Sequence, residues 1–89
     1  MNETKIPNYA KQTMKSLRAR AGMTQEEASL ALGVSKKTLK NWESNSSKMN
    51  FEDMVKASKL YSCPISYIFF GDSNAFSVKL LKEKEFQWN

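Results

Sequence analysis

The stretch TQEEASLALGVSKKTLKNWE, from Thr24 to Glu43, decides the fold of this chain. Thr24 and Glu27 have the spacing of a capping box, in which each side chain caps the backbone amide of the other, so a helix begins here. Gly33 predicts the end of that helix, because glycine adopts a left-handed backbone conformation at little cost. Ser35 is a favourable N-cap for a second helix. The stretch therefore predicts two short helices joined by a tight turn.

Each of these two helices has an inward side and an outward side. Ala28 and Leu32 lie one turn apart in the first helix, and Leu39 and Trp42 lie three residues apart in the second, so both pairs are predicted to face the core. The outward side of the second helix then carries Lys36, Lys37, Lys40 and Asn41. A short helix with lysines and an amide on its exposed side fits the major groove of DNA.

The composition fits one small globular domain. The chain has 89 residues, of which 40% are hydrophobic, and a formal net charge of +5. A helical bundle is a natural architecture at this length. The basic excess is concentrated in residues 1–45, which hold eight lysines and arginines against four acids. Such an excess favours a polyanion as the partner. The sequence shows neither a run of about 18 apolar residues that could span a membrane nor a signal peptide, and we expect a cytoplasmic protein.

Residues for other kinds of chemistry are scarce. The chain has one cysteine, Cys63, and no histidine, which excludes an internal disulfide and a Cys/His zinc site. We interpret Cys63 as an inert, partly buried thiol. Glu26 and Glu27 are neighbours in sequence and do not face each other on a helix, so they do not form a pair of catalytic carboxylates. We expect no enzyme activity, no metal ion and no cofactor.

Further helices are predicted on both sides of the opening stretch. Pro7 opens a helical pattern that ends at Gly22 and carries an apolar stripe of Ala10, Met14, Leu17 and Ala21. Asn50 is expected to cap a helix whose apolar side carries Phe51, Met54, Ala57 and Tyr61. Pro64 opens a short fifth helix that ends at Gly71, with Ile65, Ile68 and Phe69 facing the core.

The tail from Asp72 to Asn89 fits two patterns. Phe76, Leu80 and Leu81 would line a helix, whereas Phe76, Val78, Leu80, Phe86 and Trp88 alternate as in a strand. We favour the helix. In either form, these apolar side chains are suited to a dimer interface or to another protein partner.

Three segments together resemble the DNA-binding domain of phage repressors and Cro, and of related XRE-type bacterial regulators. The segments are LRARAGMTQEEA, LGVSKKTLKNWE and PISYIFFG, and the resemblance covers roughly two-thirds of the chain. It implies an all-α, five-helix lambda-repressor-like domain over residues 8–71. The helix-turn-helix would span residues 24–43, with the recognition helix at residues 35–44. Residues 1–7 would be a loose leader and residues 72–89 a C-terminal tail.

The resemblance also implies roles for individual residues. The positions on the groove-facing side of the recognition helix would contact bases, and they are Ser35, Lys36, Lys37, Lys40 and Asn41. Gln25 matches a phosphate-binding position at the start of the preceding helix. Thr24, Ser44 and Asn45 are also assigned to the DNA backbone. Arg18 and Glu43 match an internal ion pair that would set the angle of the recognition helix.

A few positions depart from the family pattern. Asn45 stands where glycine is usual, and we expect a left-handed turn there because asparagine tolerates that conformation. Ser29 replaces an alanine at a close helix crossing, and its hydroxyl is expected to bond to a backbone carbonyl. Leu30 and Ala31 stand where polar residues are common. We expect Leu30 to be covered by the C-terminal tail or by a second subunit.

Two functions remain open. The first is a sequence-specific transcriptional regulator, a repressor that binds a palindromic operator in double-stranded DNA as a homodimer. The second is a protein-interaction module of the same fold, an antitoxin or adaptor, in which DNA binding is secondary. The caps, the turn and the absence of acids between Ser35 and Asn41 favour the first function.

Overall fold

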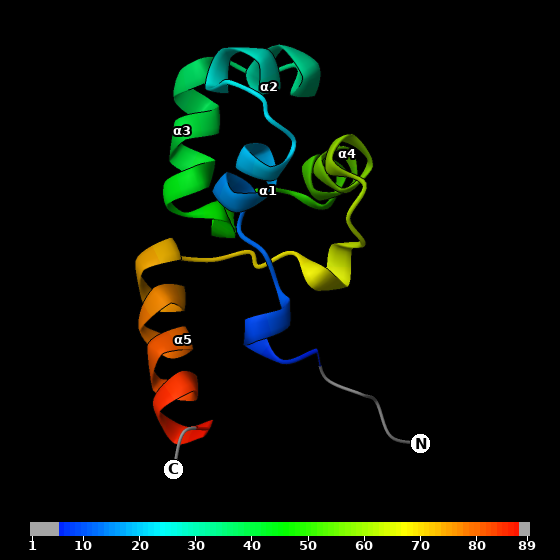
Figure 1. The fold of residues 1–89 in the computed structure, drawn as a ribbon. Coiled ribbons are helices and arrows are strands. Elements are labelled where there is room, and N and C mark those ends of the chain that lie inside the picture. Colours follow the sequence, from blue (N-terminus) through cyan, green and yellow to red (C-terminus); the bar gives the residue numbers. More distant parts are fainter. Residues whose placement is uncertain (1–5, 88–89) are drawn as a thin grey trace.

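The computed structural model describes residues 6–87, which form five α-helices and three short 3-10 helices (Figure 1). The α-helices are α1 (Met14–Arg20), α2 (Gln25–Leu32), α3 (Lys36–Ser44), α4 (Phe51–Tyr61) and α5 (Ser73–Gln87). The 3-10 helices are η1 (Asn8–Ala10), η2 (Ser46–Lys48) and η3 (Ile65–Tyr67). The described residues contain isolated bridges but no strand, and the all-α prediction is confirmed. Most of the expected leader (residues 1–5) and Trp88 lie outside the described residues.

The first predicted helix is interrupted. Pro7 opens only η1, and the backbone then runs extended through Gln12, whose N–H donates to the carbonyl of Tyr67 at 2.8 Å. A second helix start follows, because Thr13 Oγ1 accepts from the amide of Ser16 at 3.1 Å and Ser16 Oγ accepts from the amide of Thr13 at 2.9 Å. This capping box begins α1 at Met14, so the continuous helix predicted from Pro7 is wrong.

The opening stretch folds as its local signals predict. Thr24 Oγ1 accepts from the amide of Glu27 at 3.0 Å, and the Thr24 amide donates to Glu27 Oε1 at 2.8 Å. Gly33 ends α2 at φ 73°, in the left-handed region. Ser35 Oγ accepts from the amide of Thr38 at 3.0 Å and begins α3. The two helices therefore have defined ends, and the turn between them is fixed by glycine and a cap.

The core lies between α1, α2, α3 and α4. Its buried cluster consists of Met14, Ala28, Leu32, Leu39, Met49 and Ala57. Trp42 and Met54 are partly buried and pack against this cluster. Each fully buried large aliphatic side chain contributes about 1.5–3 kcal/mol. Phe51, the first residue of α4, was expected on its inward side, but it is 71% exposed and that expectation is wrong.

The segment after Pro64 forms less helix than predicted. Only the 3-10 helix η3 is present, and the chain then extends through the buried Ile68, which bridges to Gln12. The fifth α-helix is instead the tail, as favoured above. Phe76 of α5 is buried and stacks on Phe69 with ring centroids 4.1 Å apart. Asp72 caps α5, since its Oδ1 accepts from the amide of Asn74 at 2.8 Å and from the amide of Ala75 at 3.2 Å.

The start of α5 is joined to the end of α3. Ser73 Oγ donates to the carbonyl of Glu43 at 2.8 Å, and Asn45 bridges to Asp72. Asn45 has φ −152° and is extended, so the left-handed turn expected there is wrong. Its Oδ1 accepts from the amide of Ser47 at 3.0 Å and caps η2, which requires the extended form. From this junction α5 runs away from α1, α2, α3 and α4, and η1 lies beside it (Figure 1).

Ser29 and Leu30 of α2 were both expected to have partners, and the structure treats the two residues differently. Ser29 is buried and its Oγ donates to the carbonyl of Glu26 at 2.9 Å, which confirms the expected bond to the backbone. Leu30 is 76% exposed. α2 and α5 lie at opposite ends of α3 (Figure 1), so the expectation that the tail covers Leu30 is wrong. Its covering by a second subunit stays a prediction.

Candidate nucleic-acid interface

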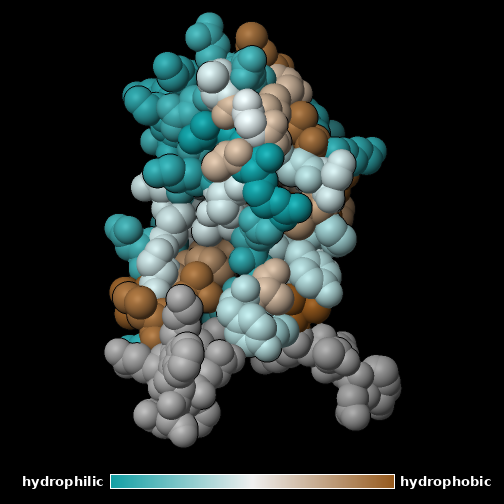
Figure 2. Space-filling view, in the orientation of Figure 1, coloured by the Kyte–Doolittle hydropathy of each residue, from teal (hydrophilic) through white to brown (hydrophobic). Residues whose placement is uncertain are grey.

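The outward side of α3 is polar and basic. The buried residues Leu39 and Glu43 and the half-buried Trp42 define its inward side. The side chains on the other side are all exposed, and they are Lys36, Lys37, Lys40, Asn41 and Ser44. Figure 2 shows hydrophilic residues over this part of the molecule and hydrophobic residues gathered lower down, where α5 extends. Successive residues turn by about 100° around a helix axis, which places Lys37 and Asn41 at the centre of the outward side.

A buried ion pair holds α3 against α1. Arg18 Nε donates to Glu43 Oε2 at 2.6 Å, and Arg18 Nη2 donates to Glu43 Oε1 at 3.1 Å. The two side chains are 15% and 5% exposed. Arg18 Nη1 also donates to the carbonyl of Met23, in the loop before α2, at 3.0 Å. The hydrogen bond from Arg18 to Glu43 raises the pKa of Arg18 above its ordinary value, so the guanidinium stays charged.

Gln25, the first residue of α2, belongs to the same network. Its Nε2 donates to Glu43 Oε1 at 3.1 Å, and its side chain is half-buried. Glu43 therefore accepts from α1 and from α2 at once and fixes where α3 lies relative to both. Gln25 was predicted at the start of a helix, but no sequence pattern indicated this bond to Glu43, because the bond depends on how the helices pack.

The other side chains expected near phosphate have structural bonds of their own. Thr24 Oγ1 is the cap of α2, and Asn45 Oδ1 is the cap of η2. Ser35, which was expected to contact a base, also has a structural bond, since its Oγ caps α3 and donates to Thr38 Oγ1 at 3.0 Å. Ser44 is exposed at the end of α3. Gln25 and Ser44 therefore lie on one side of the molecule. Unlike Thr24 and Asn45, Ser44 does not cap a helix.

A shallow pocket of about 250 Å³ joins these residues to one that the sequence analysis missed. Its lining is Lys15, Gln25, Lys40, Glu43 and Ser44. Lys15 precedes Arg18 by three residues on α1, and Lys40 precedes Glu43 by three residues on α3. Residues three apart lie on the same side of a helix, so the ion pair brings the two lysines to one pocket. The expected Arg18–Glu43 pair was the signal in the sequence from which Lys15 was predictable.

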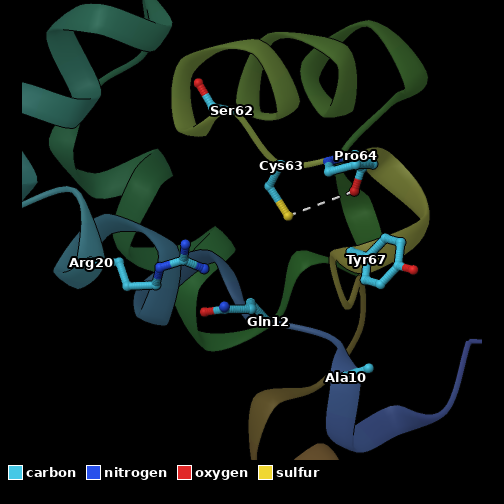
Figure 3. A pocket seen from close by; sticks show the side chains of 7 residues that line it. All are labelled: Ala10, Gln12, Arg20, Ser62, Cys63, Pro64 and Tyr67. Carbon is cyan, nitrogen blue, oxygen red and sulfur yellow. Dashed lines mark hydrogen bonds between the residues drawn. The ribbon is translucent and has the colours of Figure 1, made fainter.

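A second pocket lies on another part of the surface, between η1, α1 and the α4–η3 connection. Figure 3 shows its lining, which is Ala10, Gln12, Arg20, Ser62, Cys63, Pro64 and Tyr67, around a volume of about 300 Å³. Cys63 is partly buried and its Sγ donates to the carbonyl of Pro64 at 3.7 Å. Among the residues whose side chains the structure describes, no cluster of three or more metal-ligating side chains occurs. Over residues 6–87, no helix combines the length and the apolar character needed to cross a membrane.

Comparison with known proteins agrees with this geometry. A family model described as helix-turn-helix matches residues 14–68, from the start of α1 to the end of the η3 segment. No curated protein matches the chain. The matched residues include the capped α2, the glycine turn, α3 and the Arg18–Glu43 pair. The chain belongs to the XRE-type helix-turn-helix family of DNA-binding transcription regulators, and its domain is of the Cro and repressor type.

Proposed function

We propose that the chain recognises a specific DNA sequence by placing α3 in the major groove. The observation that carries this proposal is the outward side of α3, which presents lysines and Asn41 without any acid while Glu43 holds the helix from within. Base contacts are assigned to the exposed surface formed by Ser35, Lys36, Lys37, Lys40 and Asn41. Lys37 and Asn41 are the central readers, because lysine donates to guanine O6 and N7 and asparagine pairs with adenine N6 and N7.

Contacts to the DNA backbone would flank α3. Gln25 and Ser44 are the principal candidates, with Thr24 and Asn45 beside them. An amide or hydroxyl group near a helix end is a suitable donor to a phosphate oxygen. One N–H of the Gln25 amide is used by Glu43, and the amide carries a second N–H for a phosphate.

Two copies of the chain would bind a palindromic operator and repress transcription by occluding a promoter. In dimers of this kind the two recognition helices meet half-sites about 34 Å apart, one turn of DNA. α5 supports a dimer, since Val78 and Leu81 are 52% and 63% exposed on it. Its start is hydrogen-bonded to the end of α3 through Ser73, so a contact between two α5 helices would fix the distance between two α3 helices.

The alternative is a protein-interaction module, an antitoxin or adaptor. Leu30 and Phe51 support it, because both are large apolar side chains that are more than two-thirds exposed, at 76% and 71%. A gel-shift experiment with genomic fragments at several salt concentrations separates the two functions. A DNA regulator gives specific shifts that weaken steeply with salt. The absence of a specific shift at every salt concentration would favour the interaction module.

A further inference from the structure

The shallow pocket between α1, α2 and α3 is lined by Lys15, Gln25, Lys40, Glu43 and Ser44. Contacts between α3 and the DNA bases do not explain why Lys15 of α1 lies there. We propose that this pocket binds one phosphate of the DNA backbone, and that Lys15 and Lys40 are its two charged contacts. The proposal rests on DNA binding by α3. It adds Lys15 to the interface and assigns Lys40 to the backbone instead of a base.

The charges in the pocket favour an anion. Glu43 is the single carboxylate of the lining, and its two oxygens accept three hydrogen bonds, two from Arg18 and one from Gln25. Its negative charge is therefore balanced within the protein. Lys15 and Lys40 are exposed, and neither has an ion-pair partner in the part of the chain that the structure describes. The pocket is thus lined by two lysines from different helices, beside a carboxylate whose charge is already balanced by Arg18.

The size of the pocket also suits a phosphate group. Its volume of about 250 Å³ is several times the ~30 Å³ that one water molecule occupies in the liquid, so phosphate oxygens and some of their water can enter. Gln25 and Ser44 add an amide and a hydroxyl to the lining. The pocket therefore offers charged and neutral donors together, which is the usual set for a backbone phosphate.

The position of Lys40 on α3 agrees with this assignment. Lys37 and Asn41 stand opposite the buried Leu39, whereas Lys40 is turned about 60° from Lys37 toward the side of Glu43. A side chain on that edge of a groove-bound helix reaches the wall of the groove, which is sugar and phosphate. Lys40 and Lys15 would then hold the backbone from α3 and α1 together.

Binding measured against salt concentration tests the proposal. The proteins are the full chain and its K15Q, K40Q and K15Q/K40Q variants, with K56Q as the control that removes an exposed α4 lysine outside the pocket. The probes are a duplex that the wild-type chain selects from a random pool and a scrambled duplex of equal length. Circular dichroism and thermal unfolding of each variant establish that it is folded.

We expect K15Q to weaken binding to the selected duplex and to the scrambled duplex by one common factor. K40Q should likewise affect the two duplexes equally. One neutralised phosphate contributes about 0.9 to the slope of log affinity against log salt, so the double variant should lose about 0.9 for each bound chain, or about 1.8 for a dimer on two half-sites. The advantage of the wild type over the double variant should accordingly shrink by about 3.5-fold for each bound chain, or about 12-fold for the dimer, between 50 and 200 mM salt.

Four results would overturn the proposal. In the first, K15Q binds as K56Q does. In the second, K40Q changes the preferred sequence, which makes Lys40 a base reader. In the third, the double variant loses about 1.8 in slope for each bound chain, which means two separate phosphates per chain. If the wild-type chain binds no duplex at all, the proposed function fails first, and this result is distinct from the other three.

Discussion

Arg18 on α1 and Glu43 on α3 form a two-bond ion pair at 2.6 and 3.1 Å, and this contact fixes the recognition helix against the rest of the domain. Glu43 is also the acceptor for Gln25 through its side chain and for Ser73 through its backbone carbonyl. One residue at the end of α3 therefore joins α1, α2 and α5. Burial of this carboxylate is costly, and it is tolerated because each of its oxygens accepts from at least one donor.

Replacing Arg18 with alanine should destabilise the fold. The substitution leaves the Glu43 carboxylate buried without its charged donor, and we expect a loss of about 2–3 kcal/mol in the free energy of unfolding. Urea unfolding measures this loss. R20A is the matched control, because Arg20 is an exposed arginine on the same helix, and its effect should stay within about 0.5 kcal/mol. Equal effects of R18A and R20A would contradict the role given to the pair.

The Tyr61 hydroxyl is buried and has no hydrogen-bond partner among the residues that the structure describes. Burial raises the pKa of Tyr61 above its ordinary value of 10.0. Removing the hydroxyl in Y61F should therefore leave stability unchanged or raise it by up to about 1 kcal/mol. A clear loss of stability on urea unfolding would show that the hydroxyl makes a stabilising contact.

The same tyrosine gives a prediction for alkaline pH. A raised pKa in the folded state means that the unfolded chain ionises first, so the stability of the wild type should fall as pH rises above 10. The Y61F variant should lose less over this range, because it lacks the group that ionises. Unfolding midpoints of the two proteins compared at neutral pH and above pH 10 check this difference, and parallel curves would contradict it.

Gly71 should not tolerate a side chain. A Cβ atom at this position would lie 2.7 Å from Cζ of Phe69, a ring that is held in place by stacking on Phe76. We expect G71A to cost about 1–3 kcal/mol through this overlap. The midpoint of thermal unfolding measures the loss. The double variant G71A/F69L is the control, since a smaller side chain at position 69 should remove part of the penalty that alanine introduces.

Much of the fold follows from signals that are local in sequence. The Thr24–Glu27 capping box, Gly33 and Ser35 set the ends of α2 and α3, because each acts over three or four residues. The start of α1 was missed although its signal is of the same kind. Thr13 and Ser16 form a capping box in which serine takes the place of the usual glutamate.

The remaining differences arise from contacts between distant parts of the chain. Gln12 is extended because its backbone bonds to Tyr67 and Phe69, and Asn45 is extended because it bridges to Asp72. No local pattern encodes such pairs. The site combines both cases, since the outward side of α3 was predictable from spacing, whereas the approach of Lys15 to it was predictable only through the Arg18–Glu43 pair that joins α1 to α3.

Gln25 should contribute to affinity without contributing to sequence preference. Replacing it with alanine removes a proposed phosphate donor and one bond to Glu43. We expect Q25A to weaken binding to all duplexes by the same factor, as measured by titration of a preferred and a scrambled duplex. A changed order of preferred sequences would mean that Gln25 reaches a base.

Lys37 should have the opposite signature. If it reads a base, K37A should cost about 1–3 kcal/mol on the preferred duplex and relax the preference at one position of each half-site. Competition between duplexes that differ at single positions measures this change. An equal loss on every duplex would make Lys37 a backbone contact and leave Asn41 as the central reader.

The central claim is that α3 reads a specific DNA sequence, and selection of bound duplexes from a random pool tests it most directly. We expect one enriched motif made of two inverted half-sites whose centres lie about one helical turn apart, roughly 34 Å. K37A should enrich the same motif with one position relaxed in each half. A pool that shows no enriched sequence after repeated selection by the wild-type chain would contradict sequence-specific recognition by α3.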